Sequence, residues 1–267
     1  MTESRKTEAI LQLREIVVKA SASSKEGHIP SGLSILDILW VLYDRIMQID
    51  KTKPIDPARD RFVLSKGHGS LGLYAVLIGK GLIPETEIDD FCSFQSKLGG
   101  HPDRNKIPWV EASTGSLGHG LPIATGIALG LQIQNISSRV FTVIGDGECN
   151  EGTIWESALL ASHHHLDNLC CVVDYNHSTD RALLVGDLVD KFRSFGWNAL
   201  SVNGHDQEAL FQLLSAFPEQ KRMPTVLVAE TIKGYGVRSI ENQAAWHHRS
   251  PTTEEMSLLI KEIYENA

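Results

Sequence analysis

Residues 139–176 read RVFTVIGDGECNEGTIWESALLASHHHLDNLCCVVDYN, and no other stretch says as much about the fold. It contains two short apolar runs, 139–144 and 169–174, which are typical of buried strands. Residues 152–165 lie between them and are predicted to form a helix. Because a strand–helix–strand unit normally places its two strands side by side and parallel, the stretch predicts an α/β fold.

The rest of the chain continues this alternation of helices and strands. We expect an α/β fold with a mostly parallel sheet flanked by helices on both faces, formed by a single domain over residues 1–267. Ser34 is expected to cap the N-terminus of a helix predicted at 34–47. Further helices are predicted at 5–22, 34–47, 69–80, 118–134, 187–195, 206–217 and 253–265, and further strands at 198–202 and 224–231.

The composition is that of an ordinary globular protein, and its net charge argues against some classes of binding partner. The chain has 267 residues, 42% of them hydrophobic, and a formal net charge of −8. An acidic chain is a poor partner for nucleic acid or an anionic membrane, so we expect neither. No apolar stretch approaches the roughly 18 residues of a membrane span, and the polar N-terminus lacks a signal-peptide core. We therefore expect a cytoplasmic location.

Polar residues follow both runs of the opening stretch. Gly145-Asp146-Gly147 ends the first run, and Asn176 follows the second. In a parallel sheet these ends meet at one edge, where ligands of such sheets bind. The carboxylate of Asp146 and the amide oxygen of Asn176 are hard ligands that suit Mg²⁺, and the flanking glycines allow a phosphate to approach the backbone. A Gly-Asp-Gly sequence alone is also common in turns, so the prediction of a metal site rests on Asp146 and Asn176 together.

Residues 145–176 resemble the signature of thiamine diphosphate enzymes, which begins with Gly-Asp-Gly and ends in Asn. Other segments resemble blocks of the transketolase family in the same order, which implies a thiamine diphosphate-binding fold over nearly the whole chain. These segments are GHIPSG (27–32), SKGHGS (65–70), GGHPD (99–103), STGSLGHG (113–120), TIKGYGV (231–237) and AWHH (245–248).

The resemblance implies a set of cofactor contacts. Asp146 and Asn176 would bind Mg²⁺ through their side chains, and Ser178 would bind it through its backbone carbonyl. The Gly145–Gly147 turn and His68 would contact the diphosphate. Residues Gly115, Ser116 and Leu117 would line the aminopyrimidine and thiazolium rings, although Leu117 could instead be a core residue, with its side chain buried in either case.

Three histidines are expected in the substrate pocket by the same resemblance. His28, His101 and His247 would donate hydrogen bonds to a ketose or exchange protons with it. Each could instead be an ordinary surface or core histidine. His248 stands where the family usually has glycine. Glu151 would lie at an interface coupling two cofactor sites, or it could be an acidic residue favoured at a helix N-terminus.

The family resemblance also implies a reaction and a partner. The expected reaction is the transfer of a two-carbon ketol unit from a ketose, such as a sugar phosphate, to an aldose. The glutamate that activates the cofactor belongs to a pyrimidine-binding domain that this sequence lacks. We therefore expect a separate C-terminal subunit, in an α2β2 heterotetramer. The alternatives are a subunit of a pyruvate-using thiamine enzyme, such as an acyloin or deoxyxylulose-phosphate synthase, and a non-catalytic subunit.

Overall fold

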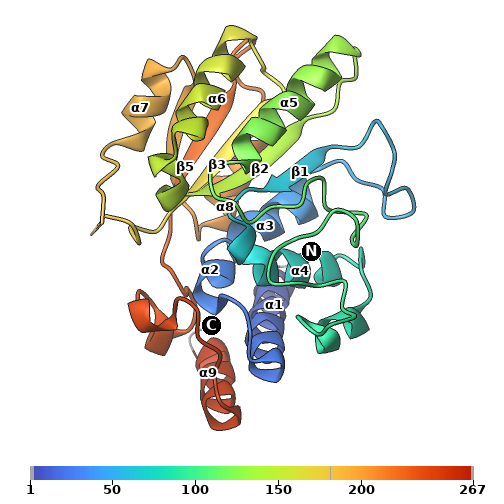
Figure 1. The fold of residues 1–267 in the computed structure, drawn as a ribbon, viewed down its shortest axis with the longest axis vertical. Coiled ribbons are helices and arrows are strands. Elements are labelled where there is room, and N and C mark those ends of the chain that lie inside the picture. Colours follow the sequence, from blue (N-terminus) through green and yellow to red (C-terminus); the bar gives the residue numbers. More distant parts are fainter. Residues whose placement is uncertain (1–2, 181, 266–267) are drawn as a thin grey trace.

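The computed structural model describes residues 3–180 and 182–265, so residues 1–2, 181 and 266–267 of the expected domain lie outside the described residues. Its centre is a sheet of five parallel strands in the order β1-β2-β3-β5-β4 (Figure 1). The α/β prediction is confirmed. The strands are β1 (Arg61–Leu64), β2 (Val140–Gly145), β3 (Leu169–Tyr175), β4 (Asn198–Asn203) and β5 (Thr225–Glu230).

Helices account for most of the remaining elements. They are α1 (Glu3–Ser24), α2 (Ile29–Ser34), α3 (Leu36–Val41), α4 (Ser70–Gly79), α5 (Gly120–Ile133), α6 (Gly152–His163), α7 (Leu188–Ser194), α8 (Gln207–Ser215) and α9 (Thr253–Glu265). The last of these, α9, lies beside α1, which brings the first and last described helices together (Figure 1).

Two apolar cores cover the two faces of the sheet. One contains residues of α5, α6 and α7, and the other contains residues of α1 to α4, α8 and α9. The neighbours Cys170 and Cys171 fall in different cores because successive strand side chains point to opposite faces. Burial on both faces explains why β2 and β3 are continuous apolar runs without polar alternation.

Strand pairing brings the predicted site together. β2 and β3 are neighbours as expected, and Gly145 pairs with Asp174 at their carboxyl ends. β1 was not predicted as a strand because only four residues pair, at an edge of the sheet. It pairs with β2, so the SKGHGS segment that follows it also reaches this edge.

The predicted helix 34–47 is wrong in its start and its continuity. Ser34 ends α2, a new helix begins at Leu36, and a π-helical turn follows from Leu42 to Ile46. The Ser34 hydroxyl is not a helix cap, because it donates to Asp174 at 2.9 Å and to the Ser31 carbonyl at 3.2 Å. The role of this hydroxyl depends on Asp174, which lies 140 positions away, and the local patterns that predict helix starts contain no information about such a partner.

Within residues 3–180 and 182–265, no helix combines the length and apolar character needed to cross a membrane.

Candidate active site at the carboxyl ends of the strands

The oxygen pair predicted from the sequence is present at the tips of β2 and β3. The backbone N–H of Ser178 donates to Asp146 Oδ2 at 3.0 Å and to Asn176 Oδ1 at 3.2 Å. Both side chains are largely buried, with exposures of 2% and 7%. Two hard oxygens therefore converge on one point beside the Ser178 backbone, a donor set that fits Mg²⁺.

Asp174 orients Asn176 from below the site. It is fully buried and accepts hydrogen bonds from Lys66, Thr231, Ser34 and, at 2.9 Å, the amide nitrogen of Asn176. Because the Asn176 nitrogen is engaged there, its oxygen faces Asp146. Burial alone would raise the pKa of Asp174, but the charge and hydrogen bond of Lys66 hold this pKa below its ordinary value.

Glu148 fixes three backbone segments around the site, and sequence reasoning missed it. Its side chain is buried and accepts from Ser65 Oγ at 2.6 Å, from Gly118 N at 2.9 Å and from Gly145 N at 2.9 Å. Burial raises its pKa. A glutamate three residues after a strand-ending glycine was the available signal, because that spacing is typical of a carboxylate that bonds back to the start of a helical turn.

The Gly145–Gly147 turn is tightly held in this structure. The N–H of Gly147, expected to face the diphosphate, donates to Asp146 Oδ1 at 2.8 Å. Burial and the nearby charge of Asp174 raise the pKa of Asp146. A cation at Asp146 would offset the cost of burying this carboxylate.

Four imidazoles gather at the other side of the site. The His28 ring lies 5.5 Å from His68, 5.3 Å from His247 and 4.5 Å from His248. Burial, followed by the charges of neighbouring histidines, lowers the pKa of His28 to about 4, and burial with the charge of Lys66 lowers the pKa of His68 to about 2. The cluster is therefore neutral at His28 and His68 near pH 7.

The His28 ring has an unused polar atom. Its Nδ1 is buried and has no hydrogen-bond partner within the described part of the chain. Buried polar atoms are normally satisfied, so this nitrogen is available to a ligand. His248, which stands where the family resemblance implies glycine, lies beside this ring and places Nε2 3.5 Å from Glu26.

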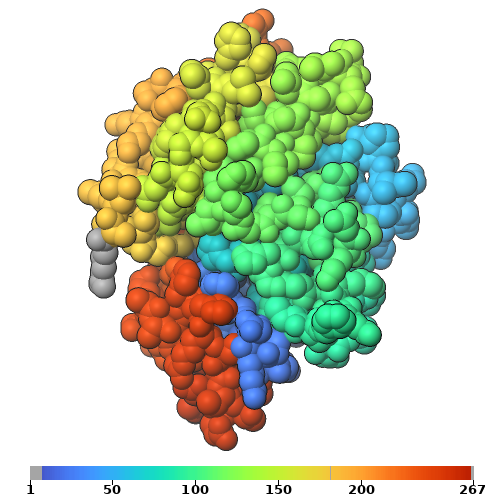
Figure 2. Space-filling view, viewed as in Figure 1, coloured from blue at the N-terminus to red at the C-terminus, as the bar shows by residue number. Residues whose placement is uncertain are grey.

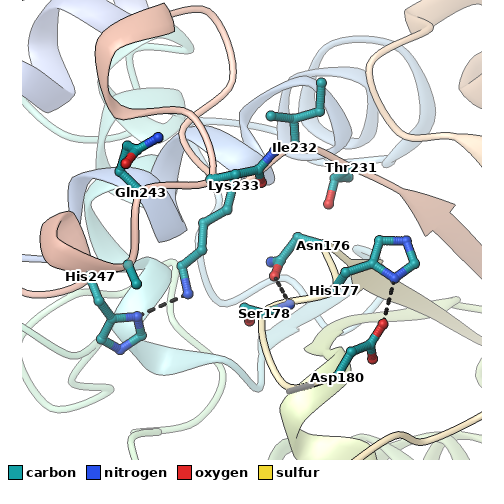
Figure 3. Close-up of a pocket in the computed structure, with 11 residues that line it drawn as sticks. Asn176, His177, Ser178, Asp180, Thr231, Ile232, Lys233, Gln243 and His247 are labelled. Carbon is teal, nitrogen blue, oxygen red and sulfur yellow. Dashed lines mark hydrogen bonds and ion pairs between the residues drawn. The ribbon is translucent and has the colours of Figure 1, made fainter. Parts of the chain in front are cut away.

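Lys233 is the second site residue that sequence reasoning missed. Its Nζ donates to His247 Nδ1 at 2.9 Å, and burial lowers its pKa to about 8. Figure 3 shows it reaching across the pocket from the segment after β5, opposite Asn176 and Ser178. In the sequence this lysine belongs to the TIKGYGV block, and nothing local indicates which way its side chain points.

The loop 113–120 is held beside the strand ends by the bond from the Gly118 N–H to Glu148. Gly115 adopts a φ of +151°, and a Cβ there would approach the His101 ring to 3.1 Å, so these two predicted residues pack together. Ser116 is exposed. Leu117 is 37% exposed, so the expectation of a buried Leu117 side chain is wrong. The loop turns inward only at the adjoining Gly118, which is buried.

Glu151 is exposed at the start of α6, where it packs against this loop. A Cβ on Gly118, whose φ is +80°, would come within 2.6 Å of the Glu151 Cβ. Glu151 is therefore at a surface position beside the loop 113–120, and the acidic group also lies at a helix N-terminus.

A cavity of about 700 Å³ joins the two sides of the site. Its walls include the Asn176–Ser178 turn, Thr231 to Lys233, and Gln243 with His247 (Figure 3). A volume of this size is typical of sites for small molecules and cofactors. Asn176 of the oxygen pair, the amine of Lys233 and the imidazole of His247 therefore line one ligand-sized space.

Comparisons with known proteins agree with this geometry. Residues 5–265 match the family model described as "Transketolase, thiamine diphosphate binding domain". The chain is 36% identical over 259 residues to a subunit of apulose-4-phosphate transketolase from Phocaeicola vulgatus, covering 95% of this chain and 90% of that protein. It is also 36% identical to 6-deoxy-6-sulfo-D-fructose transketolase subunit SqwG of Clostridium sp. (strain MSTE9), covering 94% and 93%.

A solved transketolase shows the same fold. The crystal structure of transketolase from Campylobacter jejuni superposes with a TM-score of 0.87 at 28% identity, covering 99% of this chain and 43% of that one. The family resemblance read from the sequence blocks is thus confirmed, and the chain belongs to the transketolase family, as its thiamine diphosphate-binding domain.

Proposed function

We propose that this chain binds Mg²⁺ and the diphosphate of thiamine diphosphate at the tips of β2 and β3, as one subunit of a transketolase. The convergence of the Asp146 and Asn176 oxygens beside Ser178 carries this proposal. The expected domain, residues 1–267, would then be a single N-terminal-type transketolase domain.

The cofactor roles follow the positions of the residues. Asp146, Asn176 and the Ser178 carbonyl would hold the metal ion. The Gly145–Gly147 turn, His68 and Lys233 would face the diphosphate, whose negative charge would compensate the partly buried ammonium of Lys233. Gly115, Ser116 and Leu117 would line the cofactor rings, with Leu117 contributing from the exposed side of its loop.

The imidazoles would hold the substrate. When bound, thiamine diphosphate supplies the nucleophilic carbon for ketose cleavage. His28, His101 and His247 would orient hydroxyl groups and move protons to and from substrate oxygens, which neutral rings can do in both directions. The related subunits are named for apulose-4-phosphate and 6-deoxy-6-sulfo-D-fructose, so an anionic ketose is the proposed donor and an aldose the acceptor.

A second polypeptide would complete the site. The chain aligns almost end to end with proteins that are named as single subunits of transketolases, and it spans less than half of the one-chain transketolase from C. jejuni. We propose that a C-terminal transketolase subunit supplies the activating glutamate in a cytoplasmic α2β2 heterotetramer.

Exposed apolar side chains on α5 and α6 support assembly between copies. Ile123 and Ile133 on α5 and Leu159 and Leu160 on α6 are exposed at 37% to 71%. A Cβ at Gly126 or Gly130 would meet nothing within 4 Å. The two helices lie together on the face seen in Figure 2, and α6 begins just after Glu151. Burying such a face in an interface is favourable.

The test is reconstitution. The chain is mixed with a C-terminal transketolase subunit from the same organism, and ketol transfer from ketose phosphates to aldoses is followed with and without Mg²⁺ and thiamine diphosphate. We expect activity only when both subunits, the metal and the cofactor are present. Activity of the lone chain, or activity indifferent to the metal, would refute the proposal.

A further inference from the structure

The segment that carries Lys233 is fastened to the rest of the protein by a histidine. His205 lies in the turn between β4 and α8, and its side chain is 6% exposed. Its Nε2 accepts a hydrogen bond of 2.8 Å from the backbone N–H of Ile232. Ile232 directly precedes Lys233, so this bond fixes the backbone from which the lysine side chain departs.

Asp37 sets the protonation pattern of that ring. A backbone N–H is always a donor, so Nε2 of His205 must be the unprotonated nitrogen. The ring proton of the neutral tautomer then lies on Nδ1, which donates to Asp37 Oδ2 at 3.2 Å. Asp37 is buried and is held in turn by Arg14 at 3.2 Å and Gln207 at 2.7 Å. Only one tautomer satisfies both bonds.

The packing around His205 leaves the segment little room to shift. Its ring stacks on Tyr235, with centroids 3.5 Å apart and planes at 16°. A Cβ on the preceding Gly204 would meet the Thr231 side chain at 2.4 Å, so the turn needs glycine to approach this closely. The contacts of this turn thus lie on both sides of Lys233, at Thr231 and Tyr235.

The backbone bonds of the segment leave a gap that His205 fills. Thr231 N donates to the Tyr175 carbonyl and Gly234 N to the Pro30 carbonyl, each at 3.0 Å. Ile232 N, between these anchors, uses the His205 side chain. Lys233 Nζ meets His247 at 2.9 Å across the cavity (Figure 3), a contact that depends on the direction in which the side chain leaves the backbone.

We propose that His205, held in one tautomer by Asp37, is a positioning residue that aims Lys233 at the diphosphate site. The inference rests on the proposed function only for the identity of the ligand. Removal of the Nε2 acceptor would free the Ile232 N–H, loosen residues 231–237, and weaken cofactor binding through Lys233 alone.

Two substitutions separate the two nitrogens of the ring. In His205→Asn the side-chain amide can still donate to Asp37 but is too short to reach Ile232. In His205→Gln the amide oxygen reaches about as far as Nε2 and can accept from Ile232. Hydrogen–deuterium exchange of the full chain should therefore be faster at 231–237 in the Asn variant and close to wild type in the Gln variant. Gln207→Leu, which removes a different bond to Asp37, is the matched control.

Cofactor binding tests the path through Lys233. The dissociation constant for thiamine diphosphate, measured by calorimetry with Mg²⁺ and the C-terminal transketolase subunit, should rise about tenfold in His205→Asn, the scale found for partners that orient site residues. Lys233→Met should raise it by at least as much, and adding His205→Asn to Lys233→Met should change it no further. Independent, additive effects would overturn the inference, as would unchanged exchange at 231–237 in the Asn variant.

Failure of the proposed function gives a different pattern. A wild-type chain that does not bind thiamine diphosphate with Mg²⁺ in the presence of the C-terminal transketolase subunit would remove the ligand assignment. Exchange in the Asn and Gln variants would still decide whether His205 holds the segment that carries Lys233.

Discussion

The two sides of the site stabilise their buried polar groups in opposite ways. The side at β2 and β3 buries carboxylates. A buried lysine, hydroxyls and backbone N–H groups donate hydrogen bonds to them, as around Asp174 and Glu148. The side at His28 holds partly buried imidazoles in the uncharged state, and one ring nitrogen of His28 remains without a partner in the described chain.

The difference indicates a division of labour. A charged, fully bonded network is rigid, because moving one group leaves a buried charge unpaired. That suits the anchoring of a metal ion and a diphosphate. Neutral imidazoles cost less free energy to bury than charged groups, and they can either donate or accept a hydrogen bond. They therefore suit a substrate whose oxygen atoms gain and lose protons during the reaction. Three measurements would test this contrast, and the changes that we expect decrease in size from the first to the third.

The strongest change is expected at the buried ion pair. Asp174→Ala leaves Lys66 buried without its carboxylate, and the free energy of unfolding should fall by about 3–5 kcal/mol, as for other broken buried pairs. Urea unfolding of the full chain measures this. Asp180→Ala removes a carboxylate that bonds to the exposed His177 and should cost less than about 1 kcal/mol. Similar losses in both variants would contradict the special rigidity of the strand-tip network.

Metal-dependent binding comes next. Asp146→Ala should raise the dissociation constant of thiamine diphosphate at fixed Mg²⁺ on the order of 100-fold, equivalent to about 2.7 kcal/mol. The fold should persist, since loss of this carboxylate removes a desolvation cost along with its bonds. Calorimetry at several Mg²⁺ concentrations, with circular dichroism as a folding control, measures the effect. Equal affinity of variant and wild type would show that the metal is held elsewhere.

On the imidazole side, the stability of the protein should depend on pH. The pKa of His28 is lowered from 6.5 to about 4, so between these values the unfolded chain binds more protons than the folded one. This histidine therefore contributes stability above pH 6.5 that is lost as the pH falls toward 4. His248→Gly removes part of the burial and one neighbouring charge, so the His28 pKa should rise and this loss should become shallower.

Histidine NMR titration and thermal unfolding between pH 7 and 4 measure both quantities in the His248 variant. His163→Gly, which changes a histidine at the end of α6 away from the cavity, controls for the loss of any imidazole. A His28 pKa that stays at its wild-type value in His248→Gly would show that the two rings do not influence each other.

Local patterns in the chain were sufficient for most of the fold. Continuous apolar runs identified β2 and β3, and the predicted helices 118–134 and 152–165 correspond to α5 and α6. The four-residue β1 was missed because an edge strand of that length has no periodicity to detect. The helix start at Ser34 was wrong because a capping residue type also serves as a hydroxyl donor to a distant carboxylate.

The strand-end chemistry of this protein could be read from the order of its residues, since Asp146 and Asn176 follow adjacent parallel strands and chain connectivity is enough to bring such ends together. Other groups that hold the site together could be identified only from the folded structure. Lys66, His205 and Lys233 meet their partners across intervals of 27 to 108 residues or across the cavity. Such contacts depend on side-chain direction and packing between elements, and no local pattern encodes either.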